Sequence, residues 1–151
     1  MSDITIEHVQ PLSDSKRLEK ILWKLDEDII PKLSERVNIE EYAKKLSANA
    51  EVFYVKHKDI DIGNCAVYMN NGETGFISSI AIKKEWQNKG IGNFLWKKIV
   101  VLANTRGIRT IELMVNKNNY KAIRFYNHLH FTELEIKTEW IRMRYTLKDE
   151  L

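Results

Sequence analysis

The sequence is short of cysteine, proline and glycine. Its 151 residues include one cysteine, Cys65, two prolines and six glycines, with no low-complexity run or internal repeat. A single cysteine excludes an internal disulfide and indicates a reducing compartment, so we expect a cytoplasmic protein. Hydrophobic residues make up 44% and charged residues 30% of the chain, which is typical of one globular domain, here residues 1–151.

Long apolar runs are missing as well. None approaches the ~18 residues of a membrane-spanning helix, and the first residues lack the basic and apolar regions of a signal peptide. The last four residues, Lys148 to Leu151, spell a retention signal of the endoplasmic reticulum, which is read only on proteins already in the lumen. We therefore expect no membrane association and treat this tetrapeptide as a coincidence.

Charge is spread unevenly, although the formal net charge is only +3. Residues 1–75 carry 10 Lys and Arg against 14 Asp and Glu, whereas residues 76–151 carry 14 against 7. The basic second half suits a polyanionic cofactor, and the acidic first half suits a cationic substrate such as an amine. A random asymmetry on solvated faces is the alternative, and the excess is modest for a nucleic-acid partner, which argues against one.

Periodicity in the first half predicts strands and two helices. The first helix carries apolar residues from Leu18 to Ile29 and is ended by Pro31. The predicted strands are 4–9, 52–55, 62–69 and 74–83. The first predicted helix begins after the capping residues Ser13 and Asp14, and the second, over 39–48, begins after Asn38. Acidic residues cluster around these helices, where a substrate-selecting wall is one interpretation and plain solvation the other.

The second half predicts a strand–helix–strand unit followed by a helix and a closing strand pair. A helix from about residue 90 to 106 precedes Gly107, which suits the left-handed position after a helix. So short a connection between strands implies a parallel, right-handed crossover. The remaining predicted elements are a strand over 109–115, a helix beginning near Asn119, and strands over 131–137 and 139–147.

The turn between the strand over 74–83 and the following helix has the composition of a phosphate-binding loop. It consists of Gln87, Asn88, Lys89, Gly90, Ile91 and Gly92. Free N–H groups and the helix dipole favour an anion there, glycines without a Cβ allow close approach, and Lys89 adds a charge. The spacing is neither the Walker pattern nor the dinucleotide fingerprint. A plain glycine-containing turn is the alternative.

This loop resembles the acyl-CoA pyrophosphate loop, [QR]-x-x-G-x-[GA], of the GCN5-related N-acetyltransferase (GNAT) superfamily. A second signature of that family, L-x-V-x-x-x-N-x-x-A-x-x-x-Y-x-x-x-G-F, also fits in register. Its matching residues are Leu113, Val115, Asn119, Ala122, Tyr126 and Phe131. Only the glycine differs, because His130 stands in its place, and histidine tolerates the left-handed conformation better than most residues.

The resemblance implies an α/β (α+β) fold. The expected sheet is mixed and mostly antiparallel, with six to seven strands, a parallel crossover between the fourth and fifth strands, and helices on both faces. It splays between those two strands to hold acetyl-CoA as co-substrate. The implied cofactor-binding residues are Ile80, Ala81, Ile82, Gln87, Asn88, Lys89, Gly90, Ile91, Gly92, Asn93, Asn119, Ala122 and Tyr126.

The resemblance also implies a catalytic role for Tyr126, which would protonate the departing thiolate. A backbone group near Ile80 or Ile82 would polarise the thioester carbonyl. Structural interpretations remain open beside these roles: Asn119 as a helix N-cap, Ala122 as a packing residue and Tyr126 as a core aromatic.

The general base is not identified by any motif. Glu73, Glu112, Tyr68 and a water relay are the candidates, each of which has a structural alternative. Cys65 lacks a basic partner in the sequence and is expected to be a buried apolar residue rather than a nucleophile. The four histidines show no metal-ligand spacing, so we predict no metal.

The predicted function is acetyl transfer from acetyl-CoA to a primary amine of a small molecule, directly within a ternary complex. Two alternatives remain: a non-catalytic acyl-CoA-binding regulatory domain, and a toxin-like acetyltransferase acting on aminoacyl-tRNA. The resemblance is compatible with a homodimer, although the sequence shows no interface.

Overall fold

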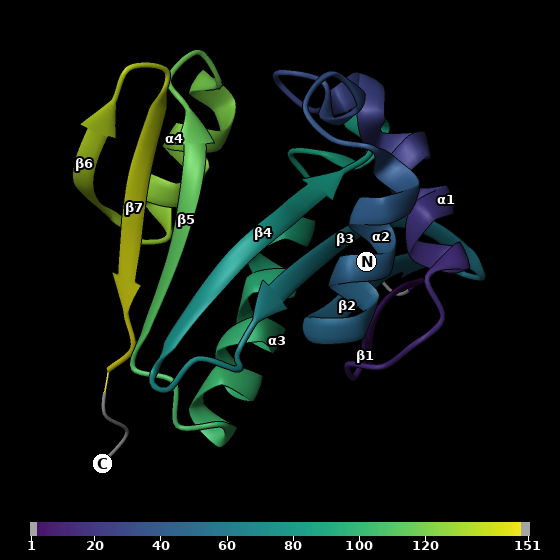
Figure 1. The fold of residues 1–151 in the computed structure, drawn as a ribbon, viewed down its shortest axis with the longest axis horizontal. Coiled ribbons are helices and arrows are strands. Elements are labelled where there is room, and N and C mark those ends of the chain that lie inside the picture. The colour runs from purple at the N-terminus through teal and green to yellow at the C-terminus, as the bar shows by residue number, and fades with distance from the viewer. Residues whose placement is uncertain (1–2, 149–151) are drawn as a thin grey trace.

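A computed structural model describes residues 3–148, which build one seven-stranded sheet (Figure 1). The strands are β1 (Ile4–Val9), β2 (Glu51–His57), β3 (Ile60–Tyr68), β4 (Thr74–Ile82), β5 (Thr110–Asn116), β6 (Thr132–Lys137) and β7 (Trp140–Thr146). Their spatial order is β1-β2-β3-β4-β5-β7-β6, and only the β4–β5 pair is parallel. The predicted mixed, mostly antiparallel sheet with one parallel crossover is confirmed.

Helices cover both faces of the sheet (Figure 1). They are α1 (Lys16–Leu25), α2 (Ile39–Asn49), α3 (Ile91–Thr105) and α4 (Tyr120–His128), with short 3-10 turns at η1 (Asp26–Asp28), η2 (Leu33–Glu35) and η3 (Lys84–Trp86). Two buried clusters result, because successive side chains of a strand point to opposite faces. Ala66 of β3 packs in the α1–α2 cluster, whereas its neighbours Cys65 and Val67 pack in the cluster under α3.

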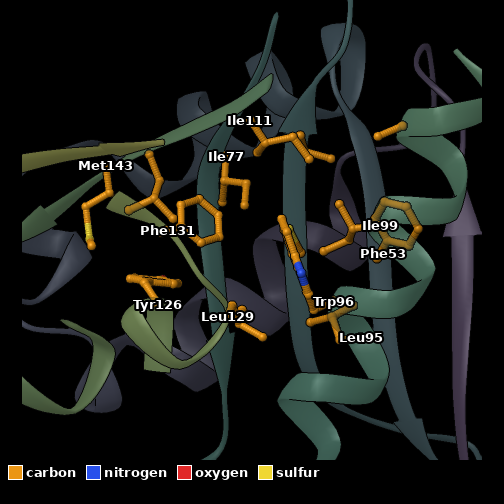
Figure 2. Packing of buried hydrophobic residues seen from close by; sticks show 14 of the residues in the cluster. Phe53, Ile77, Leu95, Trp96, Ile99, Ile111, Tyr126, Leu129, Phe131 and Met143 are labelled. Carbon is orange, nitrogen blue, oxygen red and sulfur yellow. The ribbon is translucent and has the colours of Figure 1, made fainter. Parts of the chain in front are cut away.

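The larger cluster lies between the sheet and helices α3 and α4. The ring of Trp96 of α3 lies tilted at 5.2 Å from the ring of Phe131, and the Phe131 ring lies 5.6 Å from that of Tyr126. Figure 2 shows the Phe131 ring between the rings of Tyr126 and Trp96. Cys65 is fully buried here, as expected. This packing fixes α4 against β5 and β7, and with it the position of Tyr126.

Local capping signals are confirmed at three helix ends. The Asn38 side chain accepts a hydrogen bond from the Glu41 N–H at 3.0 Å and begins α2. Gly107 takes a positive φ of 72° after α3. His130 takes a φ of 74° after α4, so histidine does adopt the conformation that the family gives to glycine.

The first helix ends earlier than predicted. It was expected to run to Ile29, but α1 ends at Leu25 and the 3-10 turn η1 follows. The cause is Asp26, which is buried and whose carboxylate accepts hydrogen bonds from the Ser34 N–H at 2.8 Å and the Ser34 hydroxyl at 2.6 Å. Ile29 is already extended, with φ −103° and ψ 135°.

Strands β4 and β5 pair only over their first four residues. Thr74 to Ile77 face Thr110 to Leu113, after which the strands diverge (Figure 1). A β-bulge lies at the point of divergence, where Ala66 of β3 pairs with Ser79, Val67 pairs with Ile77, and Ser78 is left out of register. The predicted splay between the fourth and fifth strands is therefore present.

Two further observations concern only the described part of the chain. No helix between residues 3 and 148 is long and apolar enough to cross a membrane. Within the same residues, no group of three or more His, Cys, Asp and Glu side chains is placed to hold a metal ion. The final residues of the Lys148 to Leu151 tetrapeptide, 149–151, lie outside the described residues.

Candidate active site

Two clefts open where β4 and β5 diverge. The larger, of about 620 Å³, lies between the second half of β4, the loop that follows it and α4. The smaller, of about 110 Å³, is walled by the connection between α1 and α2, the start of β7 and the ends of β4 and β5. The residues common to both walls are Ile29, Ile30, Ile80, Asn119, Ala122 and Tyr126. The clefts therefore meet beside Ile80 and Tyr126.

The N-terminus of α3 opens into the large cleft without a cap of its own. Gly90 occupies the N-cap position with a φ of 80° and offers no side-chain hydrogen bond. Among the described residues, no acceptor binds the N–H groups of Ile91, Gly92 or Asn93, whereas α2 and α4 are both capped by an asparagine side chain. Unpaired donors and the dipole of a helix of 15 residues together form a site for an anion.

Most of the residues expected to bind the cofactor line the large cleft. Those in its wall are Ile80, Ala81, Ile82, Gln87, Asn88, Gly90, Gly92, Asn93, Asn119, Ala122 and Tyr126. Lys89 and Ile91 do not line it: Lys89 is exposed, and the Ile91 side chain is 1% exposed in the core, so that only its N–H lies in the first helical turn. Lys84 and Lys121 line the cleft instead, and neither was predicted.

Gln87 connects the loop to both walls of the large cleft. Its amide nitrogen donates to the Ile82 carbonyl at 2.8 Å, and its amide oxygen accepts from Nζ of Lys121 at 3.1 Å. The Lys83 N–H donates to the Ile62 carbonyl of β3. Backbone groups of successive strand residues point to opposite sides, so those of Ile82 and Ile80 point away from β3, to the open edge of β4. Gln87 thus occupies one carbonyl of that edge and leaves the N–H groups of Ile80 and Ile82 available.

Gly92 is required by packing inside the protein. A Cβ built on Gly92 would lie 2.8 Å from Cζ and 3.0 Å from Cε1 of Phe125. The glycine expected to admit a pyrophosphate therefore also admits the Phe125 ring of α4. This contact couples the start of α3 to the middle of α4.

Tyr126 lies at the junction of the two clefts. It is 7% exposed, and its ring lies 5.7 Å from Phe125 and 5.6 Å from Phe131 (Figure 2). No described residue forms a hydrogen bond with its hydroxyl. Burial, with a smaller contribution from Cys65, raises the pKa of Tyr126 well above its usual value of 10.0. The side chain is thus a core aromatic and also a protonated donor at the clefts.

Asn119 and Ala122 each have a structural role and also lie where a binding role would require them. The Asn119 side chain accepts from the Ala122 N–H at 3.3 Å and caps α4. Both residues also line the two clefts. Capping holds the first turn of α4 in place, and the small Ala122 keeps the passage between the clefts open.

The three protein groups considered as general base do not lie in either cleft wall. Glu73 is at the opposite end of β4, where its carbonyl accepts the Arg109 N–H at 2.7 Å. Glu112 receives hydrogen bonds from Arg142 at 2.9 Å and from Arg144 at 2.6 Å. Burial acts to raise the pKa of Glu112, but these two arginines outweigh it and lower the pKa, which makes the carboxylate a poor base. Tyr68 is likewise outside both walls.

The wall of the small cleft includes polar residues that no sequence motif indicated. Arg36 follows η2, Ser78 lies at the bulge, Asn116 ends β5 and Trp140 begins β7. The Tyr42 hydroxyl of α2 donates to the Ser78 carbonyl at 3.0 Å and is also hydrogen-bonded to the Ser78 hydroxyl. These residues come from four separate segments, so no local pattern brings them together.

Comparison with known proteins agrees with this geometry. A sequence model of the acetyltransferase (GNAT) family matches residues 16–131. The chain belongs to the GNAT family. The predicted resemblance is confirmed, and the match covers both motifs, the loop at 87–92 and the signature that ends at Phe131.

Two curated GNAT relatives match part of the chain. An uncharacterized N-acetyltransferase of Methanocaldococcus jannaschii is 38% identical over 71 residues, which cover 47% of this chain and 31% of that protein. The [ribosomal protein bS18]-alanine N-acetyltransferase of Salmonella typhimurium is 32% identical over 62 residues, 41% of this chain and 42% of that protein. The matches thus span less than half the length of either relative.

The fold is shared with GNAT enzymes of known structure over nearly the whole chain. A GNAT family acetyltransferase from Elizabethkingia anophelis, solved with acetyl-CoA bound, superposes with a TM-score of 0.74 at 18% identity. The superposition covers 97% of this chain and all of that one. At this identity the likeness establishes the fold.

Proposed function

We propose that residues 1–151 form an N-acetyltransferase domain, which transfers an acetyl group from acetyl-CoA to a primary amine within a ternary complex. The observation that carries the proposal is the junction of the two clefts beside Ile80 and Tyr126. A direct transfer needs donor and acceptor to approach one point from two sides, and the splayed sheet provides two such approaches. The free Cys65 suits a reducing compartment such as the cytoplasm.

The large cleft has the chemistry that acetyl-CoA requires. Its pyrophosphate would accept hydrogen bonds from the unpaired N–H groups of Ile91, Gly92 and Asn93, with Lys84 and Lys121 supplying positive charge. The pantetheine arm would lie along the open edge of β4 between Ile80 and Ala122. The groups that would bind acetyl-CoA are therefore cationic at one end of the cleft and apolar at the other. This matches the co-substrate, which is anionic at one end and amphipathic at the other.

Acetyl transfer moves one proton as well as the acyl group. The neutral amine attacks the thioester carbonyl carbon, a C–N bond forms, the C–S bond breaks, and the amine proton leaves through water. A backbone N–H of Ile80 or Ile82 on the open edge of β4 would polarise the carbonyl. The water relay replaces a carboxylate base. Glu73 and Glu112 lie outside both cleft walls. Glu27 and Asp28 line the large cleft, but each is paired with a lysine, Lys32 and Lys83 respectively.

Tyr126 would donate its proton, or a hydrogen bond, to the departing thiolate. Because burial raises its pKa, Tyr126 stays protonated at neutral pH. A thiol has a pKa of about 8.5, so full transfer from a tyrosine of raised pKa is uphill and a strong hydrogen bond in the transition state is the main contribution. Tyr126 is the one side chain that we assign as catalytic.

A small-molecule acceptor is favoured by the volume of about 110 Å³ on the acceptor side. This is below the range of roughly 300–1,000 Å³ typical of pockets for drug-sized ligands. The relative that acts on ribosomal protein bS18 makes a protein N-terminus the second candidate.

Isothermal titration with acetyl-CoA, compared with dephosphorylated pantetheine, tests the first step. We expect binding that depends on the phosphates, followed by thiol release when an amine is added. Tyr126→Phe should retain acetyl-CoA affinity and lose at least tenfold in kcat, since positioned proton donors contribute roughly 10²–10⁴-fold. Unchanged turnover in this variant would remove Tyr126 from the mechanism.

The same titrations separate the alternatives. A non-catalytic acyl-CoA-binding domain would bind acetyl-CoA and release no thiol with any amine. An acetyltransferase of aminoacyl-tRNA would bind tRNA in a salt-sensitive manner and transfer only to the charged tRNA. Absence of acetyl-CoA binding would overturn the proposed function altogether.

A further inference from the structure

The small cleft carries positive charge and no negative charge. Arg36 is the only charged residue among the described residues of its wall, and the other polar side chains are neutral. The neutral residues with a polar side-chain group are Ser78, Ser79, Asn116, Asn119, Tyr126 and Trp140. The acidic residues of the first half point elsewhere: Asp26 is buried against Ser34, and Glu27 and Asp28 line only the large cleft. The sequence-based expectation of an acidic wall for a cationic substrate therefore does not describe this cleft.

Arg36 is held at the rim without a carboxylate partner. Its guanidinium carbon lies 5.1 Å from the ring centroid of Trp140, so a residue of the α1–α2 connection and one of β7 face each other across the cleft. Within residues 3–148 no carboxylate comes within salt-bridge distance of Arg36, whereas Arg17 and Arg144 each bind one at 2.8 Å or less. A planar guanidinium positioned in this way matches an external carboxylate.

Ser78 offers a hydrogen-bond acceptor in the inner part of the cleft, whereas Arg36 offers a cationic donor at the rim. The Tyr42 hydroxyl has one hydrogen, which it donates to the Ser78 carbonyl at 3.0 Å. The two hydroxyl groups are also hydrogen-bonded to each other, and when the Tyr42 hydrogen goes to the carbonyl, the Ser78 hydroxyl is the donor of this second bond. In this arrangement the Ser78 oxygen has only lone pairs toward the cleft, so there it accepts hydrogen bonds. An N–H group suits this position.

We infer that the acceptor is a small amino acid with a free carboxylate. Its carboxylate binds Arg36 at the rim, and its amine lies inside, hydrogen-bonded to Ser78 and directed toward the junction at Tyr126. The inference rests on the proposed function and gives it a substrate class. A polyamine or an aminoglycoside would place positive charge beside Arg36, which costs binding energy because no carboxylate lines the small cleft. The volume of about 110 Å³ limits the side chain to a small one.

Matched pairs of acceptors test this inference. The purified protein is given acetyl-CoA and either a small amino acid (glycine, alanine, serine, threonine or β-alanine) or its carboxamide, and thiol release is followed at pH 8. The two members of a pair differ only at the carboxylate. The amide has the less basic amine, so without recognition of the carboxylate the amide would react faster. We expect at least one acid to exceed its amide by tenfold or more in kcat/KM.

Variants connect the preference to Arg36. Arg36→Gln should lower kcat/KM for the preferred acid about tenfold, mostly through KM, and leave the amide unchanged, because a charge-assisted fork is lost. Arg36→Glu should reverse the preference within the pair. Lys45→Gln removes the same charge from an exposed position of α2 outside the cleft and should change neither substrate. Acetyl-CoA affinity, measured by titration, should be the same in all three variants.

Each outcome decides one of the two proposals. Equal use of acids and amides, transfer only to polyamines, or transfer only to peptides or aminoacyl-tRNA overturns the amino-acid acceptor while the acetyltransferase stands. An acid preference that survives Arg36→Glu overturns the role of Arg36 and with it this inference. Failure to bind acetyl-CoA overturns the proposed function, and the two failures are distinguished by the titration.

Discussion

The contact between Gly92 and Phe125 leads to a stability prediction that sequence reasoning alone would not make. Alanine at position 92 places its Cβ 2.8 Å from Cζ of Phe125, whereas ordinary contacts begin at 3.4 Å. The ring or the helix must therefore move by the difference, 0.6 Å. Phe125 is a half-buried side chain between α4 and the start of α3, so the movement is resisted on both sides.

The expected cost follows from two opposing effects. Overpacking of this kind costs about 1–3 kcal/mol. Replacing glycine by alanine inside a helix returns up to ~1 kcal/mol through helix propensity. We expect Gly92→Ala to destabilise the free protein by about 1–2 kcal/mol, which for a chain of this length lowers Tm by about 2–8 °C.

A double-mutant cycle measured by thermal or urea unfolding gives the decisive result. Phe125→Leu removes the ring atoms that the new Cβ would meet, so Gly92→Ala should cost little in the Phe125→Leu background, with a coupling of about 1–2 kcal/mol. Asn93→Ala, an exposed change one residue along the helix, serves as the control. Additive costs would refute the packing argument. A Gly92→Ala variant with unchanged Tm and weaker acetyl-CoA binding would instead assign this glycine to the co-substrate alone.

Two further predictions concern charge. Glu112 has a pKa below its ordinary value of 4.5 in the folded protein, so its contribution to stability is present above pH 4.5 and is lost as the pH falls through the folded pKa. Glu112→Gln should therefore lower Tm at pH 7 and flatten the decline of Tm in acid. Glu133→Gln, an exposed change on β6, should leave the profile unchanged. Lys121→Gln should weaken acetyl-CoA binding several-fold and reduce its salt dependence, measured by titration at two ionic strengths, because Lys121 lines the cleft and is held by Gln87. An equal effect of Lys89→Gln, whose side chain does not line the cleft, would contradict this assignment.

Features that depend on neighbouring residues were predictable from the sequence by itself. The capping by Asn38 involves a partner three residues away, and the positive φ at Gly107 and His130 follows from single residues at helix ends. The two motifs of the family are local as well. The first places its glycines at a fixed spacing in one turn, and the second places Asn119, Ala122 and Tyr126 at fixed spacings on one helix face. These signals determined the strand–helix–strand crossover, the splayed sheet and most of the large cleft.

Interactions between distant segments were decided only by the tertiary structure. Asp26 ends α1 because it binds Ser34, Gly92 faces Phe125, and Gln87 holds a lysine 34 residues further along the chain. The sequence offered Glu73 and Glu112 as bases, but strand register placed one at the far end of β4 and the other between two arginines.

The acceptor side of the site shows the same division most clearly. Arg36, Ser78 and Trp140 lie in segments that carry no motif, and their meeting depends on how far β4 and β5 diverge and on where β7 inserts beside β5. Local propensity is encoded within a few residues and can be read along the chain, whereas the charge and polarity of a cleft arise from packing elements against one another. The sequence by itself therefore determined the fold and the co-substrate side of this protein, and the tertiary structure decided the environment of the acceptor.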